Sequence, residues 1–153
     1  MTAEAASLHE ALAENLGKYD SRLAAQLASA DSLSAKDYLR SLRLRSVVQQ
    51  GFDRVMAGVD VLIAPTTPTV APRLGEWILD TPIGKMSWPD IAASNTFPFN
   101  VSGMPAVTVP IPTDGLPCGL QIAALPYQDQ LVLSVAQAFE RAVGGRECIA
   151  RST

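Results

Sequence analysis

Histidine, cysteine and charged side chains, on which enzymes commonly build acid–base and metal chemistry, are scarce in this sequence. The 153 residues include one histidine, His9, and two cysteines, Cys118 and Cys148, and only 18% of the residues are charged. A single histidine excludes a His-based metal site and a Ser/His triad within this chain. The cysteines lack CxxC spacing, so we expect two free thiols in a reducing compartment.

The sequence also lacks segments typical of export or of a membrane. The first residues, MTAEAASLHEALAENL, contain three glutamates and no basic start followed by an apolar block, so a secretory signal is not expected. No apolar run approaches the ~20 residues that cross a bilayer. The net charge of −3 gives no general attraction to a polyanion. We therefore expect a cytoplasmic protein that binds neither a membrane nor a nucleic acid.

Apolar residues make up 48% of the chain, and their spacing in the first third is helical. Alanine and leucine recur over residues 4–16 and 19–29, which predicts two short helices or one kinked helix. Ser34 with Asp37 three residues later is a capping-box start for a long amphipathic helix over 34–57. The apolar face predicted for this long helix consists of Leu44, Val47, Val48, Gly51, Phe52 and Val55.

Three short apolar runs predict strands. Residues 59–64 (VDVLIA) are nearly all apolar, which is typical of a strand buried on both faces in a parallel or mixed sheet. Residues 106–111 and 120–125 predict two more, joined by a connection that holds the hairpin signal Asp-Gly at 114–115. The first of these two strands is restricted to an edge or a bulge by Pro110 within it and Pro112 directly after it.

The rest of the pattern completes an α/β prediction. Residues 65–89, rich in Pro, Gly and Thr, show no periodicity and predict a long loop. Residues 128–143 predict a closing amphipathic helix with the apolar face Leu131, Val135, Ala138, Phe139 and Ala142. Three strands make a poor sheet alone. The predicted fold class is therefore α/β, a partial slice of a mixed β-sheet flanked by helices, with its other strands outside this chain.

No arrangement of catalytic residues is found in the sequence. It contains no GxSxG motif, and none of the three lysines has a serine three positions before it, which excludes an SxxK pair. Cys118 has no nearby histidine to lower its pKa, so a small apolar filler is favoured over a thiol nucleophile. We interpret Arg40, Arg43 and Arg45 as a solvated helix face rather than an anion site. Asp90, after a proline, is interpreted as a helix-start residue.

Three segments carry a family resemblance. They are DVLIAPTTP (60–68), NTFPFNVSGMPAVTVP (95–110) and GLPCGLQIA (115–123), and a helix beginning LSAKDYLRSLRLR precedes them. In this order and spacing they resemble the C-terminal portion of amidase signature enzymes. That family includes bacterial amidases and the A subunit of tRNA-dependent amidotransferases. The resemblance covers about residues 33–143.

The resemblance implies where chemistry would and would not lie. Family enzymes hydrolyse carboxamides through a serine nucleophile, a bridging serine and a lysine, all upstream of the matched region, so no catalytic residue is assigned here. The matched part is expected to supply sheet strands and some of the wall of the acyl pocket. The predicted wall residues are Thr96, Phe97, Asn100 and Gly103.

Two of these residues, Gly103 and Asn100, also fit simpler structural roles. Gly103 fits a backbone position with positive φ, and Asn100 fits a side chain that fixes its loop by bonding to backbone.

Family members that take ammonia from glutamine carry an acidic residue where this sequence has Ala93. That difference disfavours the amidotransferase type.

We therefore expect residues 1–153 to form a single C-terminal segment of an amidase signature hydrolase, catalytically incomplete alone and without metal or cofactor. The complete enzyme would cleave a small-molecule amide to a carboxylate and ammonia or an amine. The expected partner is an N-terminal amidase segment, or a second copy through self-association. Two alternatives stay open: a structural partner in a split enzyme, and a non-catalytic binding module that retains the fold fragment.

Overall fold

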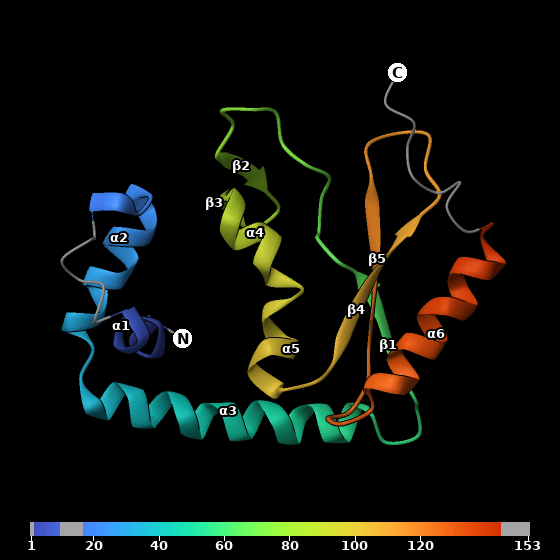
Figure 1. Cartoon of the computed structure of the whole chain (residues 1–153), viewed down its shortest axis with the longest axis horizontal. Helices are drawn as coiled ribbons and strands as arrows, with labels where there is room; N and C mark the ends of the chain where they lie inside the picture. The colour runs from blue at the N-terminus through green and yellow to red at the C-terminus, as the bar shows by residue number, and fades with distance from the viewer. Residues whose placement is uncertain (1, 10–16, 145–153) are drawn as a thin grey trace. The chain divides into compact units, whose positions relative to one another are not determined.

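The computed structural model describes residues 2–9 and 17–144 (Figure 1). The chain divides into two compact units, residues 1–46 and residues 47–153. The helices are α1 (Thr2–His9), α2 (Ser21–Ala28), the 3-10 helix η2 (Ser29–Ser32), α3 (Ala35–Val55), α4 (Trp88–Ser94), α5 (Phe97–Ser102) and α6 (Asp129–Ala142). The strands are β1 (Leu62–Pro65), β2 (Ile78–Thr81), β3 (Gly84–Ser87), β4 (Ala106–Ile111) and β5 (Cys118–Ala123). Among the described residues, no helix is both long and apolar enough to cross a membrane.

The first unit contains the short helices predicted at the start of the chain. Asp20 caps the start of helix α2: its carboxylate accepts a hydrogen bond from the backbone N–H of Arg22 at 3.0 Å. The Nδ1 atom of His9 lies 2.8 Å from the hydroxyl of Tyr19, with the two rings edge to face. The only histidine of the chain therefore pairs with a tyrosine near α1 and α2. Residues 10–16 of the predicted first helix lie outside the described residues.

The long helix α3 begins as predicted, with a capping box. The Ser34 hydroxyl accepts a hydrogen bond from the backbone N–H of Asp37 at 3.1 Å, and the Asp37 carboxylate accepts one from the backbone N–H of Ser34 at 3.4 Å. The predicted apolar face is only partly buried, which corrects our expectation. Phe52 packs into the core, whereas Leu44, Val47, Val48 and Val55 are exposed.

Strands β1, β5 and β4 form a three-stranded sheet in that order, and both pairings are antiparallel. The predicted hairpin is confirmed, with Ala106 opposite Ala123 and Ile111 opposite Cys118. The α/β class is confirmed as well. The strand predicted over 59–64 begins only at Leu62, and it lies at the edge of the sheet rather than buried on both faces.

One face of this sheet packs on helix α6. Val109 of β4 and Ile122 of β5 form a buried cluster with Val132 and Ala136 of the helix. Figure 1 shows α6 running along the sheet on this side. The buried face of α6 is centred on those two residues, whereas Ala138 and Ala142, which we predicted to be apolar contacts, are exposed.

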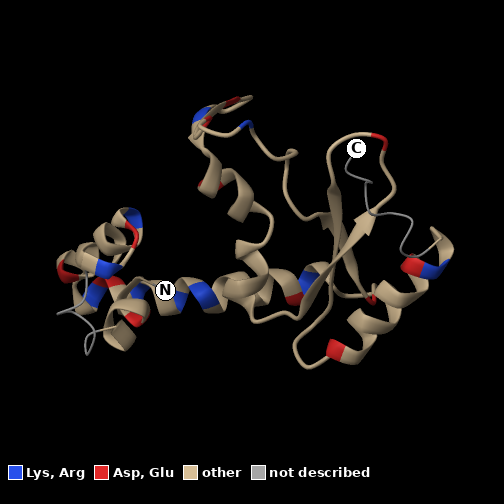
Figure 2. Cartoon of the chain, turned by 45° about the horizontal axis from the view of Figure 1, so that its top comes forward, with Lys and Arg blue, Asp and Glu red and all other residues tan. Residues whose placement is uncertain are grey.

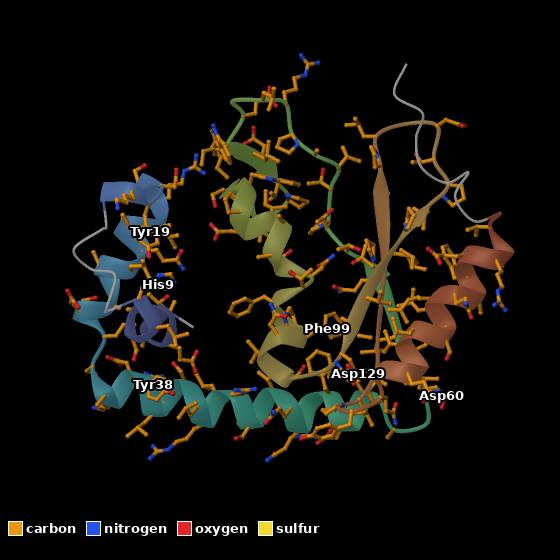
Figure 3. All side chains as sticks on the ribbon, viewed as in Figure 1. His9, Tyr19, Tyr38, Asp60, Phe99 and Asp129 are labelled. Carbon is orange, nitrogen blue, oxygen red and sulfur yellow. The ribbon has the colours of Figure 1, made fainter. Side chains whose placement is uncertain are left out.

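The opposite face of the sheet packs on α3 and α5 at one end. Met56, Phe99, Met104 and Ala123 are buried there, with the partly buried side chains Phe52, Leu62 and Leu125 around them. The ring of Phe99 projects from α5 toward α3 (Figure 3), and its centroid lies 5.6 Å from that of Phe52. This aromatic pair connects α3 to α5.

The predicted loop over 65–89 contains structure that we did not predict. Strands β2 and β3 pair as a hairpin, with Ile78 opposite Ser87 and Thr81 opposite Gly84. Gly84 has φ 115°, a conformation that favours glycine. The Thr81 hydroxyl donates to the carbonyl oxygen of Gly84 at 2.7 Å and closes the turn.

On the face opposite α6, the central strand makes a close approach at Gly119. A Cβ atom at this position would lie 2.6 Å from Cγ2 of Thr108 and 2.7 Å from Oγ1 of Thr66. Thr108 lies on β4, and Thr66 follows β1, so the two threonines reach over β5 from opposite sides. Only glycine leaves room for this contact.

We expect Phe52→Ala to lower the free energy of unfolding of the 153-residue chain by about 3 kcal/mol, because it removes one half of the aromatic pair. The matched control is Val47→Ala, on the same helix but exposed, which should change stability by less than about 0.5 kcal/mol. Urea unfolding followed by circular dichroism measures both. Equal losses would contradict the packing described here.

Gly119→Ala and Gly51→Ala should change stability in opposite directions. The first should cost about 1–3 kcal/mol, since the added methyl meets two threonines. Gly51 is in the interior of α3 with nothing within 4 Å of an added Cβ, so the second should add about 0.5–1 kcal/mol through helix propensity. The same urea titrations test both. A Gly119→Ala chain as stable as the parent would contradict the close approach of Thr66 and Thr108 to Gly119.

Candidate functional site

Three segments that are far apart in the sequence are connected by hydrogen bonds on the sheet face opposite α6. The side-chain amide of Asn95, at the end of α4, donates to the carbonyl oxygen of Pro65 at 2.9 Å. The side-chain amide of Gln121 on β5 donates to the carbonyl oxygen of Asn95 at 3.0 Å. Gln121 is only 3% exposed. These bonds fix the ends of β1 and α4 against the central strand.

A second polar contact lies beside this chain of bonds. The hydroxyl of Thr66 donates to that of Thr108 at 3.1 Å, above Gly119. The backbone N–H of Thr66 also donates to the carbonyl oxygen of Gly119 at 2.8 Å. The loop that follows β1 is thereby held on the sheet by main-chain and side-chain bonds. We refer to Thr66, Asn95, Thr108, Gly119 and Gln121 as the polar cluster.

Helices α4 and α5 carry the predicted wall residues next to this cluster. Ser87 caps the start of helix α4: its hydroxyl accepts a hydrogen bond from the backbone N–H of Asp90 in the first turn, so the helix-start interpretation of Asp90 is confirmed. Thr96 joins the two helices, and its hydroxyl donates to the carbonyl oxygen of Ala93 at 3.2 Å. Thr96 is therefore tied back to α4.

The structure places Phe97 and Asn100 on the outer side of α5. Both are exposed, whereas Phe99 and Ser102 of the same helix are buried. The side chain of Asn100 makes no hydrogen bond to the described part of the chain, so its expected loop-fixing role is not found. Two of the four predicted wall residues are thus free to contact something outside the described residues.

Gly103 ends α5 in the left-handed conformation, with φ 78° and ψ 20°. The N–H groups of Gly103 and Met104 both donate to the carbonyl oxygen of Phe99, at 2.9 and 3.2 Å. The predicted positive φ is confirmed. Gly103 serves the backbone here, because a residue with a Cβ is disfavoured at this φ.

The surroundings of these residues are almost without charge. From Ile91 to Gln128 the only charged residue is Asp114, in the connection between β4 and β5. Figure 2 shows β1, β4, β5 and α5 without a blue or red segment. The thiol of Cys118 donates weakly to the carbonyl oxygen of Leu116 at 3.6 Å. The segment can therefore form a wall or a scaffold, but it offers no nucleophile with a base.

Metal binding has no support in this part of the chain. Within residues 2–9 and 17–144, no group of three or more His, Cys, Asp or Glu side chains is placed to hold a metal ion. Cys148 lies outside these residues. The polar atoms of the cluster are amides and hydroxyls, which suit hydrogen bonding rather than metal coordination.

Sequence reasoning missed the role of the polar cluster. The available signal was Gln121, a polar residue in the otherwise apolar run LQIAAL. A polar side chain in a central strand must find a hydrogen-bond partner, and here the partner is the main chain of Asn95. Thr66 and Thr108 gave no comparable signal, because threonine is common in exposed strands and loops.

The Amidase family model matches residues 6–133 of the chain. The A subunit of glutamyl-tRNA(Gln) amidotransferase from Methanosarcina mazei is 44% identical over 107 residues, which are 69% of this chain and 21% of that protein. The same subunit from Methanococcoides burtonii is 38% identical over 132 residues, 84% of this chain and 27% of that protein. The chain thus spans about a fifth to a quarter of the length of these relatives.

Solved structures agree on the fold. The crystal structure of an amidase superposes with a TM-score of 0.84 at 28% identity, covering 94% of this chain and 33% of that chain. A bacterial aryl acylamidase of the amidase signature family gives a TM-score of 0.75 at 23% identity, a likeness of fold alone. Since the family model extends over residues 6–133 and the described fold is that of a third of a solved amidase, the chain belongs to the amidase family.

Proposed function

We propose that this chain is the C-terminal part of an amidase signature hydrolase and that it acts only together with the rest of the fold. The observation that carries the proposal is the unequal coverage: almost all of this chain superposes on only 33% of a solved amidase. The whole enzyme would convert a carboxamide to a carboxylate and ammonia or an amine. This segment contributes sheet strands and part of a pocket, and the nucleophile comes from the remainder.

The proposed pocket wall is the outer side of α5. Phe97 and Asn100 are three residues apart, so they share one face of the helix, and both are exposed. Phe97 offers an apolar ring, and Asn100 offers a side-chain amide with no hydrogen-bond partner among the described residues. Thr96 and Gly103 stand at the two ends of the helix and set its position. This pairing of apolar surface with one polar group is common in small-molecule sites.

A hydrolase fits better than an amidotransferase, although the similar proteins from Methanosarcina mazei and Methanococcoides burtonii are amidotransferase subunits. Ala93 stands where glutamine-using family members carry an acidic residue. It lies near the end of α4, and its carbonyl oxygen accepts from the backbone N–H groups of Asn95 and Thr96. A methyl group at this position provides no carboxylate beside the proposed wall.

We further propose that residues 1–153 act as one C-terminal segment in the cytoplasm. The family match runs across the division between the two compact units, which supports a single segment. Cys118 is a free thiol, in keeping with a reducing compartment. The proposed partner is the N-terminal amidase segment.

The 153-residue chain alone should release no ammonia from simple carboxamides above the buffer rate. Removal of a serine-hydrolase nucleophile typically costs about 10⁶ in rate, and the described residues offer no substitute. Co-expression with the N-terminal two thirds of the 28%-identical amidase should restore ammonia release. Turnover by the repurified chain alone that disappears in Cys118→Ala would overturn the proposal and make the thiol the nucleophile.

In the reconstituted enzyme, Phe97→Ala and Asn100→Ala should each lower kcat/KM by about tenfold, equivalent to about 1.4 kcal/mol of transition-state stabilisation. The control is Gln137→Ala, at an exposed position of α6, which should leave kcat/KM within about twofold. Steady-state kinetics on a small amide measure all three. If all three variants match the parent, α5 is not part of the pocket.

A further inference from the structure

Against the residues that the structure describes, the outer edge of β1 is open at one residue, which the hydrogen-bond register identifies. Residues opposite each other in an antiparallel pair alternate between hydrogen-bonded and non-hydrogen-bonded pairs. The N–H of Thr66 donates to Gly119 O, so Thr66 and Gly119 are a bonded pair. Two residues earlier on β1, Ala64 opposite Gln121 bonds in the same way. The backbone groups of Ile63 and Pro65 therefore point away from β5.

Pro65 closes its end of this edge. Proline has no N–H to offer to another strand, and the carbonyl oxygen of Pro65 already accepts from the side chain of Asn95 at 2.9 Å. Asn95 is held there in turn by Gln121. No described residue covers Ile63 in this way, so within the described part of the chain its N–H and C=O remain available for a neighbouring strand.

The side chain of Ile63 is also uncovered. It lies opposite Ile122 and hence on the face that packs on α6. Ile122 is fully buried, whereas Ile63 is 59% exposed, because α6 packs mainly on β4 and β5. An apolar side chain and an unpaired backbone edge thus coincide at one residue of an edge strand.

We propose that this edge of β1 receives a strand from the part of an amidase fold that this chain does not contain, and that the same part covers Ile63. The inference rests on the proposed function and names the contact through which the two parts join. The solved amidase has two thirds of its chain beyond the region that superposes on this one, which is ample to provide the strand and its cover.

A second copy of this chain fits the edge less well. Ile63 offers one N–H and one C=O, and Pro65 stops the ladder at the next outward-facing position. So short an edge cannot hold two copies together by main-chain bonds alone. The incoming strand has to be part of a larger body that makes other contacts, as the remainder of an amidase fold would.

Amide hydrogen exchange by NMR tests the geometry directly. In the 153-residue chain alone, the Ile63 amide should exchange at least about 100-fold faster than that of Ala64, which bonds within the sheet. On binding the N-terminal two thirds of the 28%-identical amidase, co-expressed as a separate polypeptide, the Ile63 amide should become protected by a similar factor. A concentration-dependent protection in the chain alone would mean that a second copy occupies the edge and would overturn the proposal.

A charge at the edge tests the contact energetically. Ile63→Lys should weaken association with the same amidase polypeptide by at least about tenfold, since edge lysines block strand addition. Leu133→Lys is the matched control, because Leu133 is 61% exposed on α6 and lies off the edge. Its association should stay within about twofold of the parent. Both variants should unfold like the parent when alone.

The outcomes separate this inference from the proposed function. If a complex forms and hydrolyses amides, but Ile63→Lys binds like Leu133→Lys and the Ile63 amide stays unprotected, the proposed function stands and the β1 contact is wrong. If no complex forms with the parent chain, both are wrong.

Discussion

The second unit is organised around the central strand β5, whose two faces carry buried side chains with different requirements. Ile122 requires an apolar cover, which α6 provides, and Gln121 requires a hydrogen-bond partner, since a buried amide without one is costly. The Gln121 amide finds it in the main chain of Asn95, and the Asn95 side chain reaches Pro65. One buried polar residue thus fixes the position of α4 and α5, and with them the proposed pocket wall.

The same network explains why the site region holds so little chemistry. Amides, hydroxyls and main-chain groups can set distances between loops without a charge, and from Ile91 to Gln128 the chain uses a single charged residue. Burying an ionised group here would require a paired partner. An uncharged scaffold can instead be covered by another part of the fold, and that part would supply the nucleophile and its base.

The sequence predicted local features best. Asp-Gly at 114–115 marked the hairpin, and Ser34 with Asp37 marked the start of α3, because turn and cap geometry depend on a few adjacent residues. Pro110 was correctly restricted to an edge: it sits at a position of β4 where no N–H is needed toward β5. The β2–β3 hairpin was missed, since its four-residue strands lack an alternating apolar pattern. The network of Gln121 depends on three distant segments, and no local pattern could reveal it.

Two of the wrong predictions, those for VDVLIA and for the apolar stripe on α3, share a physical cause. VDVLIA was expected to be buried on both faces, and the stripe on α3 was expected to face a core, yet Ile63, Leu44 and Val47 are exposed. The spacing of apolar residues in a segment reflects all the packing contacts that the segment makes in the complete fold. These include contacts with residues that lie on another part of the fold. Large apolar side chains left exposed at such spacing indicate a contact surface. Such apolar side chains are exposed on α3 and β1, and under our proposal they form the surface that the rest of an amidase fold would cover.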